Sequence, residues 1–201
     1  MKLSQHVLHA IDDLERGEFD SALLHACIAT DATARRLFSR DESTRRAFVA
    51  CVRKYYWIVE PMIGAGINLD ETRFSNIQLK KKNPPDLAEI VYEIFRCSHA
   101  HGDEVPAEFS VVATSGGLVS SWMLADGHLH MPDRILWALL AVSVFCRTNS
   151  GQKTAGEYFL ALGGERFLIR DWWGREDDFR DFAAQHNRVR VKLEGLERPW
   201  S

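Results

Sequence analysis

The amino-acid sequence predicts an all-α fold: a helical bundle with a small β-hairpin insert and a C-terminal extension. Apolar residues recur at helical spacing through most of the first 150 residues. A stretch around residues 108–131 has β-type runs instead, with Asp126-Gly127 as a two-residue hairpin turn. The chain has 201 residues, a length that suits one well-buried domain. We therefore expect residues 1–150 to form the bundle, with the insert at 108–131, and residues 151–201 to pack on the same domain.

The first two helices are predicted from apolar residues at helical spacing. One covers residues 4–16, where Ser4 is placed to cap the start and Gly17 to end the helix. The next begins near Ala22 and continues to Phe38 on many small residues, which allow a neighbouring helix to approach closely.

Two further helices are predicted on either side of an irregular connection. Asp41-Glu42-Ser43-Thr44 can start the third, which runs toward Pro61. Residues 64–83 lack sustained periodicity and are predicted to be a connection with a short helix at 72–79. Pro85-Asp86 then opens the fourth helix, because proline is tolerated and aspartate is favoured in a first turn.

The second half of the chain mixes strands and helices. The β-type runs at 108–113 and 119–125, followed by 128–131, predict a small antiparallel insert. The most apolar helix is expected from Arg134 to Arg147. Beyond it we expect a helix at Glu157–Leu162, a turn at Gly163-Gly164, a strand at Arg166–Asp171 and a terminal helix at Asp177–His186.

Composition restricts the function classes. The formal net charge of -3 argues against a protein that binds nucleic acid through overall positive charge, so any such contact must be local. The best local candidate is an arginine run that includes Arg35, Arg36, Arg45 and Arg46; the alternative interpretation is a solvated helix face. No P-loop motif occurs, which excludes nucleotide hydrolysis of that type.

The cysteines and the apolar runs predict a cytoplasmic protein without a membrane segment. The four cysteines are widely spaced in apolar settings, as expected for buried reduced thiols. The N-terminal residues lack the uninterrupted apolar core of a signal peptide. The longest apolar run, Ile135–Phe145, is too short to cross a bilayer.

The segment from Arg96 to Gly102 is the strongest candidate for chemistry. Arg96 offers a permanently charged fork for phosphate oxygens, and His101 can move protons near neutral pH. The alternative is structural, because basic residues at a helix C-terminus are favoured and Gly102 can cap the helix. In a regular α-helix Arg96 and His101 would be about 140° apart. A shared phosphate therefore requires the helix to unwind or a second copy of the chain to contribute.

With these helices placed, the chain resembles the HEPN (higher eukaryotes and prokaryotes nucleotide-binding) superfamily. Residues 14–29 look like the turn between the first two helices of that fold. Arg96-xxxx-His101-Gly102 is similar to its Arg-x(4–6)-His motif. The resemblance implies a helical bundle that dimerises with the two motifs facing each other. It also implies a metal-independent endoribonuclease of a defence or toxin–antitoxin type, with an antitoxin or other regulatory protein as a possible partner.

Carried onto this chain, the resemblance gives His101 the role of general acid or base and Arg96 that of holding the scissile phosphate. His99 and Glu104 are candidates for orienting the imidazole. The position after the arginine, often polar in active members, is Cys97 here. The second hypothesis is therefore a catalytically inactive module that binds RNA, a nucleotide or a partner protein.

The histidine pairs His99/His101 and His128/His130 suggest a third hypothesis, a metal-dependent hydrolase. Alternate residues share a face on a strand, so His128 and His130 could ligate one ion. The alternative is a pair of exposed hairpin histidines. No third ligand is fixed by the sequence, and our leading reading includes no metal and no cofactor.

Overall fold

The structure is a computed structural model of the chain. It describes residues 2–38, 42–63, 66–75, 77, 79, 83–96, 109–112, 123–125 and 128–185. The architecture within these residues is mainly α-helical, as predicted. The helices are α1 (Leu3–Glu15), α2 (Phe19–Leu37), α3 (Thr44–Lys54), α4 (Tyr56–Ile63), α5 (Leu87–Ile90), the π-helical η1 (Val91–Arg96), α7 (Arg134–Phe145), the 3-10 turn η2 (Arg147–Asn149), α8 (Ile169–Trp172) and α9 (Glu176–Gln185). The strands are β1 (Phe109–Val112), β2 (Met123–Ala125), β3 (His128–Pro132), β4 (Phe159–Leu162) and β5 (Glu165–Leu168).

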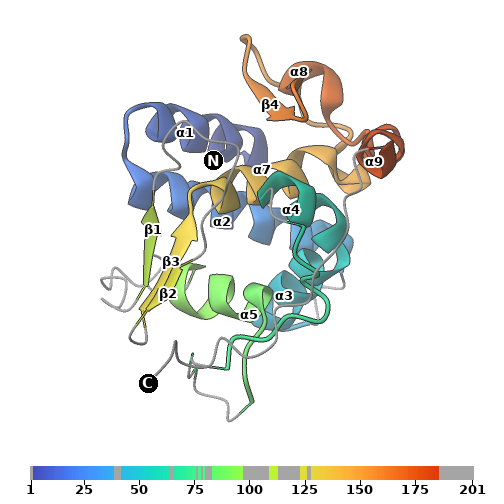
Figure 1. Cartoon of the computed structure of the whole chain (residues 1–201). Coiled ribbons are helices and arrows are strands. Elements are labelled where there is room, and N and C mark those ends of the chain that lie inside the picture. Colours follow the sequence, from blue (N-terminus) through green and yellow to red (C-terminus); the bar gives the residue numbers. More distant parts are fainter. Residues whose placement is uncertain are drawn as a thin grey trace.

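Helix α7 forms the centre of the core. It contacts α1, α2, α4 and α8, and Figure 1 shows it crossing the middle of the molecule. Every residue from Ile135 to Phe145 except Trp137 is buried, so this helix is apolar on nearly all sides. The α-helical part ends at Phe145 rather than at the predicted Arg147, and η2 continues the turn. In the part of the chain that the structure describes, no helix is long and apolar enough to cross a membrane.

The α1–α2 hairpin is close to the prediction. Gly17 adopts a φ of 76°, the left-handed conformation that ends a helix at little cost for glycine. The predicted cap at Ser4 is wrong, because α1 starts one residue earlier and Ser4 is buried within its first turn. Instead Lys2 occupies the capping position, and its backbone N donates to Gln5 Oε1 at 2.8 Å.

Helices α3 and α5 start close to the predicted positions, and each has a side-chain cap. Ser43 Oγ accepts from the backbone N of Arg46 at 3.3 Å, and Asp86 Oδ1 accepts from the backbone N of Glu89 at 3.0 Å. The predicted third helix breaks at Tyr55 into α3 and α4. The expected short helix at 72–79 is wrong for the described residues of that stretch, none of which is helical.

The three-stranded sheet has the order β1-β3-β2. Strands β2 and β3 form the predicted antiparallel hairpin. The expectation of a wholly antiparallel insert is wrong, because β1 pairs with β3 in parallel, with Phe109 opposite Leu129. Buried Leu129 and Met131 alternate with half-buried histidines along β3. The central strand thus turns one face toward the core and the histidine face away from it.

The C-terminal extension differs from the prediction at its start. Residues 159–162 form strand β4 instead of a helix, and β4 pairs antiparallel with β5. Gly163 and Gly164, which join them, have φ values of 62° and 89°. A two-residue turn in which both φ values are positive matches the twist of a β-hairpin. The Gly163-Gly164 turn therefore favours a strand at residues 159–162 over the predicted helix. The predicted strand at Arg166–Asp171 is confirmed as β5 up to Leu168 and is wrong beyond it, where α8 begins at Ile169. The predicted terminal helix is confirmed as α9.

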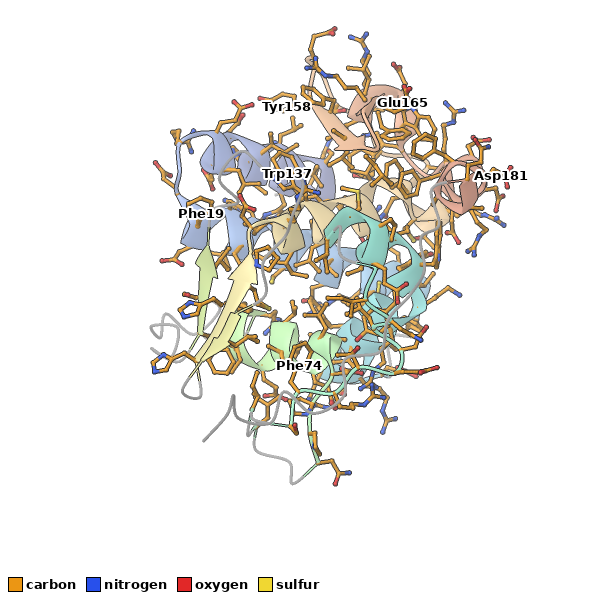
Figure 2. The ribbon with its side chains drawn as sticks, viewed as in Figure 1. Phe19, Phe74, Trp137, Tyr158, Glu165 and Asp181 are labelled. Carbon is orange, nitrogen blue, oxygen red and sulfur yellow. The ribbon has the colours of Figure 1, made fainter. Side chains whose placement is uncertain are left out.

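Aromatic side chains join this extension to the bundle. Phe145 of α7 stacks on Phe179 of α9 with ring centroids 3.8 Å apart, and Trp57 of α4 lies 6.2 Å from the same ring. Trp172 is half-buried and packs edge-on to Phe167, with ring centroids 4.7 Å apart. Figure 2 shows Glu165 and Asp181 of the extension at the opposite end of the molecule from Phe74, which lies beside α5.

Candidate functional site

The candidate site begins where α5 changes its winding. Asp86 caps α5, and the Arg53 guanidinium donates to the same carboxylate at 2.6 Å. From Val91 to Arg96 the helix is π-helical, a winding rare in proteins and frequent at functional sites. The separation expected between Arg96 and His101 depends on residues 97–101, which lie outside the described residues.

Arg96 ends η1 and turns its side chain toward α2. Its Nη2 donates to Asp31 Oδ2 at 3.2 Å, and its guanidinium carbon lies 5.6 Å from the centre of the Tyr92 ring. The side chain is 22% exposed. Arg96 is therefore held by a carboxylate and an aromatic ring while part of it remains accessible to an anion.

Asp31 links two arginines. Its Oδ2 also lies 3.6 Å from Nη2 of Arg35, one helical turn further along α2. Its Oδ1 is buried and has no hydrogen-bond partner in the described part of the chain. Two guanidinium groups, Arg35 of α2 and Arg96 of η1, thus share one carboxylate.

The remaining residues of the motif lie outside the described residues. These are His101 and the supporting candidates His99 and Glu104, together with Cys97. Arg96 is therefore the residue of the predicted motif that the structure places.

The predicted arginine run is divided between two helices. Arg35 and Arg36 lie at the end of α2, whereas Arg45 and Arg46 lie at the start of α3. Arg36 donates to Asn149 Oδ1 at 2.8 Å, and Arg46 is exposed.

Arg45 joins α3 to the helix that carries Arg96. Its Nε donates to Glu93 Oε1 at 2.5 Å, and its Nη2 lies 3.5 Å from Glu89 Oε1. These carboxylates raise the pKa of the Arg45 guanidinium, chiefly through the hydrogen bond to Glu93. Arg45 thus forms ion pairs within the fold, which weakens its attraction for a negatively charged ligand.

The second histidine pair lies on β3. His128 and His130 are both half-buried, and Ser110 Oγ lies 2.6 Å from Nδ1 of His130. Among the residues that the structure describes, no group of three or more histidine, cysteine or acidic side chains is arranged to hold a metal ion. The described geometry gives the metal hypothesis no third ligand.

Comparison with known proteins places the whole chain in one family. Residues 2–197 match the family model described as Rv1289. The chain belongs to the Rv1289 family. It is 31% identical to "Uncharacterized protein Rv1289" of Mycobacterium tuberculosis (strain H37Rv) and to "Uncharacterized protein Mb1320" of Mycobacterium bovis. The match covers 98% of this chain and 93% of each relative. No solved structure gives a significant match.

This member of the Rv1289 family also contains a polar cluster that the sequence reasoning missed. His6, His9 and Asp13 of α1 face Ser21 and His25 of α2. The signal was present in the spacing, because residues 6, 9 and 13 repeat at helical intervals along one side of α1. We define these five residues as the hairpin cluster.

Proposed function

We propose that this protein is a metal-independent endoribonuclease with a HEPN-like arrangement, in which Arg96 binds the scissile phosphate and His101 transfers protons. The observation that carries the proposal is the placement of Arg96. It lies at the end of a π-helical segment, held by Asp31 and Tyr92 yet partly accessible, directly before the rest of the motif. A guanidinium that is oriented before the substrate arrives pays less entropy on binding a phosphate.

The proposed reaction is cleavage by the neighbouring ribose hydroxyl. His101 takes the proton of the 2'-hydroxyl, whose oxygen attacks the phosphorus while the bond to the 5'-oxygen breaks and that oxygen receives a proton. The products are a 2',3'-cyclic phosphate and a 5'-hydroxyl. Arg96 stabilises the charge on the non-bridging oxygens. We propose a homodimer in which each protomer contributes to the site, acting on cytoplasmic RNA in a defence or toxin–antitoxin setting.

The test is cleavage of a mixed pool of single-stranded RNA in excess EDTA. We compare the wild type with His101→Ala, Arg96→Ala and the control Arg147→Ala, which removes a 66% exposed arginine at the start of η2. We expect cutting with cyclic phosphate ends by the wild type and the control alone. Unchanged cutting by either the Arg96 or the His101 variant would overturn the proposal. Light scattering on the same samples tests the dimer.

The second candidate is a catalytically inactive module that binds RNA, a nucleotide or a partner protein such as an antitoxin. The observation that favours it is that the candidate arginines bind other side chains of the protein. Arg45 pairs with Glu93, and Arg36 donates a hydrogen bond to Asn149. Arg96 contacts Asp31. Cys97 in place of a polar residue points the same way. Binding of the RNA pool without cutting, lost in the Arg96 variant, would favour this candidate.

A further inference from the structure

The residues of the hairpin cluster form a row of polar contacts along one side of the α1–α2 interface. Near the turn, Ser21 Oγ donates to Asp13 Oδ2 at 2.6 Å, and Arg16 donates to the other oxygen of the same carboxylate. Further from the turn, the ring of His25 packs against the rings of His6 and His9, at centroid distances of 5.1 and 5.4 Å. The rest of the interface is apolar and buried, and includes Val7, Ala10, Ile11, Leu23 and Ala26.

His6 and His25 are joined directly. Their Nδ1 atoms lie 2.9 Å apart, the distance of a hydrogen bond. One of these nitrogens must carry a proton and donate it, and the other must accept with its lone pair. The contact therefore exists only while at least one of the two Nδ1 atoms is unprotonated.

Few negatively charged groups lie near His6 and His25 to stabilise the two rings when both are protonated. Asp13 Oδ2 lies 3.9 Å from His25 Nε2, but both oxygens of this carboxylate already accept hydrogen bonds from Ser21 and Arg16. The neighbouring Asp12 accepts from Tyr158 at 2.8 Å, on the side of the extension (Figure 2). Helix α7, which packs against both α1 and α2, has no titratable side chain between Ile135 and Phe145.

Burial lowers the pKa of both imidazoles from the ordinary value of 6.5, because the charged ring loses solvation. Repulsion from His25 lowers the pKa of His6 further. Asp13 acts in the opposite direction on His25, and His9 lowers it again.

We propose that the His6–His25 contact is an acid-sensitive latch between α1 and α2. One added proton can bind Nε2 of the ring whose Nδ1 donates, which leaves the N–H···N bond in place. A second proton places hydrogens on both Nδ1 atoms and two charges side by side, which removes the bond and separates the rings. The edge of α1 that carries His6 then loosens from α2, and the apolar residues beneath it become accessible to solvent.

The direction of the pH dependence follows from the lowered pKa values. Well above pH 6.5 both rings are neutral in the folded and unfolded chains, so the pair adds no pH dependence there. Below pH 6.5 the unfolded chain takes up protons before the folded chain does. The free energy of unfolding therefore decreases as the pH falls, until the folded pKa values are passed.

The experiment uses the full chain. We would titrate the histidine ring signals by NMR from pH 8 to 4.5 and measure amide exchange along α1 at both ends of the range. We expect two rings that titrate below pH 6.5 and exchange in α1 that becomes severalfold faster in acid, after correction for intrinsic rates. His6→Gln and His25→Gln should lessen this acceleration, whereas the control His128→Gln on β3 should retain it.

Two results would overturn the proposal. One is titration of both rings at or above pH 6.5 in the wild type, which requires no variant to fold. The other is an acid-induced acceleration of α1 exchange that is the same in all three variants as in the wild type.

Discussion

Asp31 and Arg96 lie 65 residues apart in the chain and form an ion pair that joins α2 to η1, with Nη2 and Oδ2 3.2 Å apart. The carboxylate is 12% exposed and the guanidinium 22%, so the pair is shielded from water more than a surface pair is. The residue that we propose as the phosphate ligand is thus oriented by the second helix of the bundle.

The first prediction concerns this pair. Asp31→Asn keeps the shape of the side chain but removes its charge, and we expect it to lower the free energy of unfolding by about 1–2 kcal/mol. Arg35→Ala removes the 62% exposed partner of the same carboxylate and should cost less than about 0.5 kcal/mol. Urea unfolding of the two variants measures both values. Equal losses would show that Asp31 does not preferentially hold Arg96.

The second prediction separates the two roles of Asp86. This side chain is 3% exposed, caps α5 through Oδ1 and accepts from Arg53 through Oδ2. Asp86→Ala removes both interactions and should cost about 2–3 kcal/mol. Asp86→Asn keeps the cap and should cost about 1 kcal/mol less than the alanine variant. Thermal or urea unfolding compares them, and a more harmful asparagine would contradict the capping role.

The third prediction tests the close packing of Gly174, in the C-terminal extension, against Ser150. Gly174 has a φ of +74°, and a Cβ added there would lie 2.5 Å from Cα of Ser150. We expect Gly174→Ala to lower the free energy of unfolding by about 3 kcal/mol or more. Gly164→Ala is the matched control: its φ is +89° with nothing within 4 Å, so only backbone strain of about 1 kcal/mol applies. Similar losses would mean that Ser150 yields easily.

The fourth prediction concerns thiol chemistry. Cys27, Cys51 and Cys146 are all buried, and burial raises the pKa of the Cys51 thiol. Reaction with an aromatic disulfide reagent at pH 8 should therefore label at most one of the four cysteines in the folded chain. In denaturant, all should react. Rapid labelling of two or more thiols in the native protein would contradict this packing.

Much of the fold could be predicted from local signals. The helix end at Gly17 and the helix starts near Ser43 and Asp86 depend on a few adjacent residues, and the structure confirms them. Strand β4 was mistaken for a helix because four apolar residues in a row fit both periods, and the pair of glycines that follows was the better evidence. The parallel partner of β1 depends on pairing between distant residues, which no local pattern contains.

The candidate site was less predictable than the fold. The apolar positions Leu87, Ile90 and Ile94 fit an α-helix, so nothing in the spacing indicates the π-helical winding of η1. The partner of Arg96 could not be foreseen either, because Asp31 belongs to another helix. The hairpin cluster is different. The sequence shows the helical spacing of its residues on α1, but the contacts with His25 and Ser21 of α2 could not be predicted without the fold.

The central position of α7 has a consequence for synthesis on the ribosome. Helices α1 to α4 occupy the first 63 residues, yet the helix that fills the space between them spans 134–145. Residues 1–63 therefore leave the ribosome with apolar surface on α2 and α4 that lacks α7 until residues 64–145, 82 further residues, have been added. During that interval the nascent chain is exposed to aggregation and to chaperone binding, and completion of α7 ends it.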